Sequence, residues 1–211
     1  MLPFGRPAVF SIAPDTPARV TYEHGISPKH TLCVHDLDGQ GREWEISGTV
    51  AKVSIYNSKN LTLRLPGRIV TSMIEMHNVA DLRLVVGTSP APDPPAPLGT
   101  LQLDPDLRNV KIEYGTPSSV GKVVLAPLLT EDDSGRRSFG LSQLSLQAGD
   151  NAPFVLADAE GRLCAPQSER PPISPMDPSA DLPRQWVLSY RDDGWTSQGL
   201  QRGDKDYPQL A

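Results

Sequence analysis

Three side chains capable of acid–base chemistry recur at fixed spacing in one part of the chain, and a fourth lies beside the last of them. His35, Tyr56 and His77 are each 21 residues apart (56 − 35 = 21; 77 − 56 = 21), and Glu75 lies just before His77. Histidine changes charge near neutral pH, and a neighbouring glutamate can orient it or act as a general base. If the protein is an enzyme, these four residues are its candidate catalytic residues.

The spacing comes from an internal repeat. The segment YNSKNLTL at 56–63 is followed by HNVADLRL at 77–84, and RNVKI at 108–112 resembles KNLTL at 59–63. Self-similarity at 20 to 50 residues is typical of solenoids. Apolar and polar residues alternate within each unit, which indicates strands, and the Asn-rich segments between them are typical of turns.

These patterns predict an all-β protein, with short parallel strands stacked into a β-helix of about 21 residues per coil. The alternative is an ordinary antiparallel sandwich whose similar segments arose by chance. In the β-helix, one set of apolar residues forms buried ladders: Ile55, Leu61, Leu63, Met76, Leu82 and Leu84. The outward set on three successive coils is Cys33 and His35, Ser54 and Tyr56, then Glu75 and His77.

The outward column allows two interpretations. Stacked rings can simply cover a sheet face, or the imidazoles, phenol and carboxylate can line a site. A metal would accept His77 and Glu75, but His35 lies two coils away, about 9.6 Å. We therefore predict no metal and no cofactor. A second column, Asp36, Asn57 and Asn78, is predicted to stabilise turns.

Composition narrows the classes of partner. The net charge of −5 argues against nucleic-acid binding and weakly against anionic membranes, and 22 prolines among 211 residues indicate much loop. Two cysteines favour a reducing compartment, and neither a signal peptide nor a membrane-spanning run is visible. A cytoplasmic protein is the expectation.

The chain divides into three predicted parts. Residues 1–29 form an N-terminal segment that precedes the β-helix. Residues 30–146 form the β-helix, with a Pro-rich insertion at 88–97. Residues 147–211 contain a Pro-rich loop (165–183) and a terminal hairpin. The hairpin is predicted from strands at 185–190 and 195–200 around Arg191-Asp192-Asp193-Gly194. It would pack on the β-helix or exchange with a second copy to give a homodimer.

The stretch VSIYNSKNLTLRLPGRIVTSMIEMHNVADLRLVVG resembles the paired repeats in the C-terminal domain of cyclase-associated proteins, in a superfamily with tubulin-folding cofactor C. The resemblance covers roughly residues 30–115. It implies a right-handed parallel β-helix and, by the cyclase-associated pattern, a module that binds monomeric actin. The tail from Pro183 is similar in kind to the dimerisation strand of those proteins.

One activity of the superfamily is excluded by the residues. Cofactor C relatives use an arginine finger in a Gln-x-Arg-x-His-like motif, and the corresponding run here is Met73-Ile74-Glu75-Met76-His77. Glu75 would repel the negative charge that develops on a transferring phosphoryl group, so a GTPase-activating role is rejected. The alternative to actin binding is an enzyme or small-molecule binder that uses the His35, Tyr56, Glu75 and His77 face.

Overall fold

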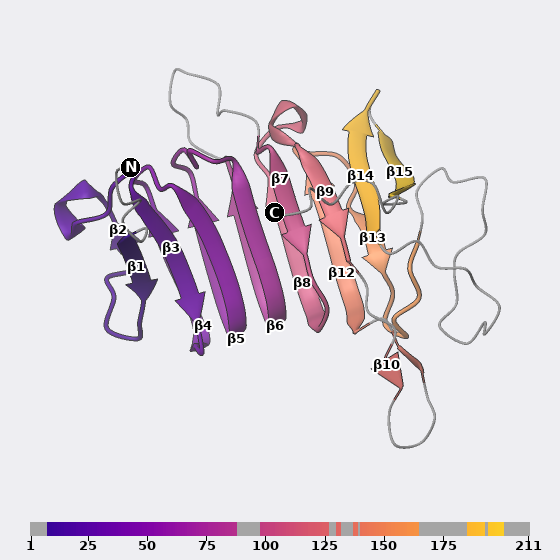
Figure 1. Cartoon of the computed structure of the whole chain (residues 1–211), viewed down its shortest axis with the longest axis horizontal. Coiled ribbons are helices and arrows are strands. Elements are labelled where there is room, and N and C mark those ends of the chain that lie inside the picture. Colours follow the sequence, from indigo (N-terminus) through magenta and orange to yellow (C-terminus); the bar gives the residue numbers. More distant parts are fainter. Residues whose placement is uncertain are drawn as a thin grey trace, which may run out of the picture.

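The chain forms an all-β structure with a large mixed sheet (Figure 1). The computed structural model describes residues 8–87, 98–126, 130–131, 137–138, 140–164, 185–192 and 194–200. The strands are β1 Ala8–Ile12, β2 Arg19–Val20, β3 His30–His35, β4 Asp38–Ile46, β5 Lys52–Leu65, β6 Met73–Val86, β7 Thr100–Leu103, β8 Leu107–Tyr114, β9 Lys122–Leu125, β10 Thr130–Glu131, β11 Arg137–Ser138, β12 Leu141–Ala148, β13 Phe154–Ala157, β14 Gln185–Arg191 and β15 Gly194–Leu200. Two short 3₁₀ helices, η1 Tyr22–His24 and η2 Pro117–Ser119, complete the described elements.

The 21-residue repeat of the sequence corresponds to the register in which neighbouring parallel strands pair. Ile55 of β5 pairs with Met76 of β6, and Leu63 pairs with Leu84, so paired residues are 21 apart (76 − 55 = 21; 84 − 63 = 21). Val110 of β8 in turn pairs with Leu82, which confirms the alignment of 108–112 with 59–63. The parallel pairing that the repeat predicts is therefore present, and the antiparallel sandwich is wrong for this part of the chain.

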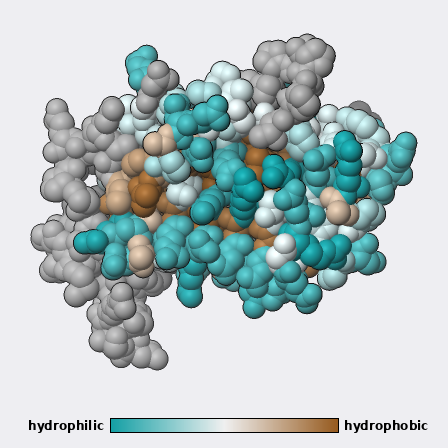
Figure 2. Space-filling model, turned by 180° about the vertical axis from the view of Figure 1, so that it is seen from behind, coloured by the Kyte–Doolittle hydropathy of each residue, from teal (hydrophilic) through white to brown (hydrophobic). Residues whose placement is uncertain are grey.

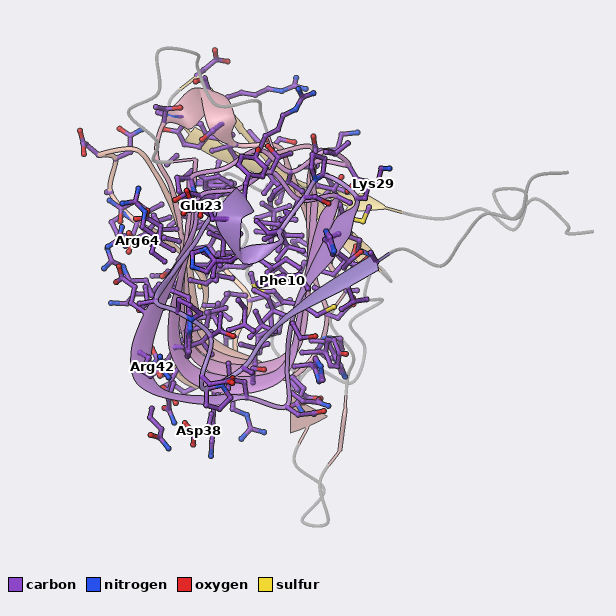
Figure 3. All side chains as sticks on the ribbon, turned by 90° about the vertical axis from the view of Figure 1, so that its left-hand side faces the viewer. Phe10, Glu23, Lys29, Asp38, Arg42 and Arg64 are labelled. Carbon is purple, nitrogen blue, oxygen red and sulfur yellow. The ribbon has the colours of Figure 1, made fainter. Side chains whose placement is uncertain are left out.

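The long strands bend where two asparagines leave the usual strand conformation. Asn57 and Asn60 of β5 have φ of 51° and 57°, a left-handed conformation that asparagine tolerates better than most residues. Asn78 and Asp81 of β6 repeat the pattern with φ of 50° and 51°. Figure 3 looks along the stack from its N-terminal side and shows the long strands curving around packed side chains.

The bends divide the outer surface into two faces. We call the front face the outer surface of β1, β3, residues 52–56 of β5, residues 73–77 of β6, β7 and β9, which are hydrogen-bonded in that order. The back face is the outer surface of β2, β4, residues 61–65 of β5, residues 82–86 of β6, β8 and β12.

Strand β4 contains a bulge at the same bend. Asp38 pairs with Lys59 and Arg42 pairs with Leu61, so three residues of β4 oppose one residue of β5. Gln40 and Gly41 inside this bulge have φ of 52° and 76°. The bulge explains why Trp44 aligns with Leu63 only after a slip of two positions, because 63 − 44 = 19 rather than 21.

The predicted inward ladder is buried. Leu63 and Leu84 have no exposed surface, and Ile55 and Met76 are 1% exposed. Leu61 and Leu82 are 3% and 2% exposed. Burial of apolar area is the dominant favourable contribution to folding, so this ladder is the main source of stability in the central repeats.

The predicted terminal hairpin is present. Strands β14 and β15 pair antiparallel, and β14 also pairs antiparallel with β9 at the end of the front sheet. Trp195 contacts Phe154 of β13 and Tyr190 of β14, at ring-centroid distances of 6.2 Å and 5.2 Å. This aromatic cluster joins the hairpin to the end of the β12–β13 pair, so the hairpin packs on the stack.

The Pro-rich segments at 88–97 and 165–183 lie outside the described residues. Within the described part, the sheet continues beyond residue 146, because β12 ends at Ala148 and pairs with β13. No helix in that part has the length and apolar character needed to cross a bilayer.

Candidate functional site

The three ring residues of the outward column lie side by side on the front face. His35 pairs with Tyr56, and Tyr56 pairs with His77, on three successive parallel strands. The His35 and Tyr56 rings stack at a centroid distance of 5.3 Å with 12° between their planes. His77 is exposed. The column predicted from the 21-residue spacing therefore exists, and it presents one stacked pair and one exposed imidazole.

Glu75 is held by a lysine. Its Oε2 lies 2.6 Å from Nζ of Lys52, which reaches diagonally from the neighbouring strand β5. No hydrogen bond joins Glu75 to His77 among the described residues. In that part of the chain, no group of three or more His, Cys, Asp or Glu side chains is arranged to hold a metal ion. The carboxylate is therefore engaged in a surface ion pair.

Cys33 departs from the expected exposure. It lies in register with Ser54 and so belongs to the predicted outward column, but it is only 9% exposed. Burial raises the pKa of its thiol, and the charge of Lys52 only partly opposes that effect. Because the thiolate is the nucleophile, this microenvironment does not activate Cys33.

The polar column beside the rings forms a ladder at the bend. Asn78 donates from Nδ2 to Oδ1 of Asn57 at 2.8 Å, and Asn57 donates to Oδ1 of Asp36 at 3.1 Å. Donation from Asn57, and then from His35, holds the pKa of the Asp36 carboxyl below its usual range. Asp36 and His35 also approach to 3.3 Å. The predicted turn-stabilising role of this column is consistent with its hydrogen bonds.

The back face carries cross-strand ion pairs instead of rings. Arg64 contacts Glu43 at 2.6 Å, and Arg83 donates from Nε and Nη2 to the two oxygens of Glu113 at 2.9 Å and 2.8 Å. These hydrogen bonds from Arg83 are the main reason that the pKa of Glu113 is lowered. Hydrophilic residues interrupted by hydrophobic ones mark this face in Figure 2.

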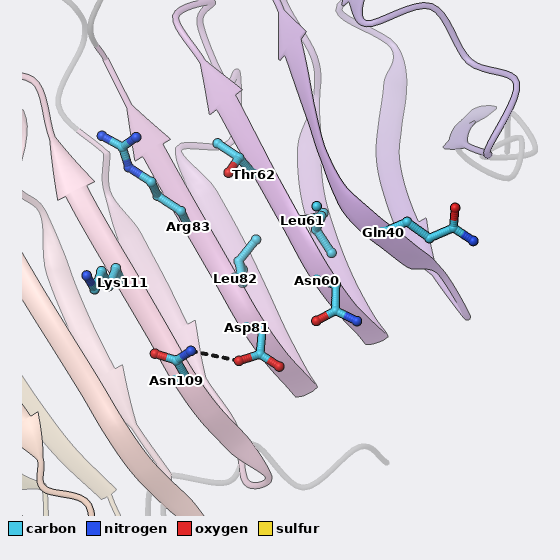
Figure 4. A pocket seen from close by; sticks show the side chains of 10 residues that line it. Gln40, Asn60, Leu61, Thr62, Asp81, Leu82, Arg83, Asn109 and Lys111 are labelled. Carbon is cyan, nitrogen blue, oxygen red and sulfur yellow. Dashed lines mark hydrogen bonds between the residues drawn. The ribbon is translucent and has the colours of Figure 1, made fainter.

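A shallow hollow of about 620 Å³ lies at the edge of the back face, beside the β4 bulge (Figure 4). Two rows of side chains line it: Gln40, Asn60, Asp81 and Asn109 at the bend, and Thr62, Arg83 and Lys111 on the strands. Sequence reasoning did not find this site. The signal available was the pair of strand residues at 62 and 83, which the repeat aligns, followed by Lys111 in the third unit.

No family model, curated protein or solved structure matches this chain. The resemblance to cyclase-associated proteins therefore depends on the residues of the repeat and of the tail from Pro183.

Proposed function

We propose that the chain is a right-handed parallel β-helix that acts as a protein-binding module, with monomeric actin as its partner. The parallel register at a 21-residue offset supports the β-helix. The sense in which the chain winds from the front face to the back face in Figures 1 and 3 supports a right-handed coil. Actin as the partner follows from the resemblance to cyclase-associated proteins.

The front-face column is the observation that carries the binding role. Aromatic side chains that are already ordered bury a large area on binding at low entropic cost. Tyr56 is ordered by its stack on His35, and the exposed His77 extends the same surface by one strand. We infer that Tyr56 and His77 form the centre of the contact with the partner.

The contacts of Glu75 weigh against catalysis as the main role of this face. A general base needs its carboxylate free to reach a proton, and Glu75 ends on Lys52. The enzyme or small-molecule-binder interpretation stays a hypothesis, and none of the described contacts of His35, Tyr56, Glu75 or His77 favours it.

The test is release of a fluorescent nucleotide from monomeric actin. Micromolar wild-type protein should accelerate release, and the double variant Tyr56→Ala, His77→Ala should lose at least 1–2 kcal/mol of binding free energy, which is roughly a tenfold weaker affinity. The matched control is Lys122→Ala, on the same face at β9 and away from the ring column. An unchanged release rate with the wild-type protein would rule out actin as the partner.

A further inference from the structure

The hollow beside the β4 bulge contains a lysine, Lys111, whose charge acts on Glu113 from a distance. Three arginines of the back face end on carboxylates: Arg19 on Glu45, Arg64 on Glu43, and Arg83 on Glu113. Lys111 is exposed and makes no hydrogen bond or ion pair within the described part of the chain. It is in register with Arg83 on the neighbouring strand, so the two cationic side chains lie in one row.

The geometry of Arg83 leaves donors free for a ligand. Its Nε and Nη2 are fixed by Glu113, which holds the guanidinium in one orientation, while Nη1 has no partner among the described residues. The hydroxyl of Thr62 continues the row on β5. Thr62, Arg83 and Lys111 therefore form a row of hydrogen-bond donors, in which the charge of Arg83 is paired with Glu113 and that of Lys111 has no ion pair within the described residues (Figure 4).

The second row presents oxygen atoms. Asn60 donates an amide proton to Asp38 at 3.0 Å, and Asn109 donates one to Oδ1 of Asp81 at 2.7 Å. The amide oxygens of Asn60 and Asn109 and the Oδ2 of Asp81 have no partner within the described residues. Each of these asparagines keeps its second amide proton, and Gln40 adds another amide, so the bend row offers both acceptors and donors.

We propose that this hollow binds an acidic oligosaccharide, a chain of sugars that carry carboxylates. Such a ligand presents carboxylates to the row of Thr62, Arg83 and Lys111. Its hydroxyls, which both donate and accept, face the amides and carboxylate of Asn60, Asp81 and Asn109. An extended acidic peptide fits less well, because its successive side chains point to opposite faces and only every second carboxylate can reach the row of Lys111. Asp81 repels carboxylates from the bend row and so sets the orientation of the ligand.

This site is separate from the front-face column and does not depend on the proposed binding of actin. The hollow lies on the back face and at the bend, whereas His35, Tyr56 and His77 belong to the front face. A variant at Lys111 should leave any effect on actin nucleotide release unchanged, so the failure of one proposal is distinguishable from the failure of the other.

The test uses NMR titration of the isotopically labelled full chain with a hexamer of galacturonic acid at low ionic strength. Amide signals of residues 60–62, 81–83 and 109–111 should shift, and Lys111→Gln should weaken binding by roughly tenfold, as expected for loss of a charged hydrogen bond. Arg108→Gln is the matched control. Arg108 is also exposed and lies on β8, but it does not line the hollow, so its loss should change the affinity by less than about twofold.

Two further ligands identify what is recognised. The methyl-esterified hexamer, which lacks negative charge, should bind at least tenfold more weakly, since the cationic row then has no charged partner. Polyglutamate should bind more weakly than the sugar acid. Equal binding of polyglutamate through Lys111 would make this an acidic-peptide site and overturn the proposal, as would the absence of shifts at the hollow at millimolar hexamer.

Discussion

The front and back faces share the two long strands β5 and β6, but their outward side chains make different contacts. On the front face, β3, β5 and β6 present a stacked His35–Tyr56 pair and an exposed His77. On the back face, cross-strand ion pairs join Arg64 to Glu43 and Arg83 to Glu113. Parallel pairing at one register therefore does not determine the types of the outward side chains, which differ between the two faces.

The back face also covers apolar surface with charged side chains. Val85 points outward between Arg64 and Glu113 in the register, yet it is only 2% exposed. Long charged side chains bury their aliphatic stems while keeping their charges in water. On the front face, the corresponding outward positions hold the stacked rings of His35 and Tyr56 and the exposed His77.

The first and largest expected effect concerns the core that both faces share. Ile55→Ala beneath the front face and Leu63→Ala beneath the back face should each cost ~2–5 kcal/mol of unfolding free energy, because each removes a fully buried side chain. Urea unfolding measures both. A loss below half a kcal/mol for either variant would show that the core beneath that face is not closely packed.

The second effect concerns the bend between the faces. Asn57→Ala should destabilise by about 1–3 kcal/mol, since alanine is disfavoured at a φ of 51° and the variant loses the hydrogen bonds to Asp36 and from Asn78. Asn57→Gly keeps the conformation and should cost less. An equal loss for the two variants would mean that the hydrogen bonds, not the backbone conformation, define the bend.

The third effect is a pH dependence of stability that comes from the back face. The pKa of Glu113 is lowered in the folded state, mainly by hydrogen bonds from Arg83. The ionised Glu113 therefore contributes to the free energy of unfolding above its unfolded-state pKa of ~4.3. That contribution is lost as the pH falls through the lower pKa of the folded state. Wild-type stability should decrease more than that of Glu113→Gln over this range, by at most ~1 kcal/mol. Parallel pH profiles for the two proteins would contradict the assignment.

The smallest effect is expected at the exposed end of the front column. His77→Ala should change unfolding free energy by no more than ~0.5 kcal/mol, because the side chain is exposed and makes no stacked contact within the described part. Thermal unfolding compares the variant with the wild type. A larger loss would show that the ring column supports the fold as well as presenting a surface.

The sequence predicted what depends on backbone register. Asparagines at 57 and 78 marked the bend, alternation placed Leu63 and Leu84 inside, and the turn before Gly194 located the hairpin. These features follow from period and turn chemistry, both of which are local.

What the sequence did not predict depends on side-chain reach. The diagonal contact of Lys52 with Glu75 and the burial of Cys33 are set by rotamers and neighbouring elements, which spacing does not specify. The hollow was also not predicted from the sequence, because the β4 bulge that borders it adds two residues without a distinctive motif.

That bulge has a consequence for how this chain can change in length. Two additional residues in β4 are absorbed between Asp38 and Arg42, and Trp44 and Ile46 still face inward beyond them. Because strand side chains alternate with a period of two, an insertion of two residues preserves which residues are buried. The bend at Gln40 is thus a site where duplicated repeats can diverge by pairs of residues, and where a single-residue deletion would turn Trp44 out to solvent.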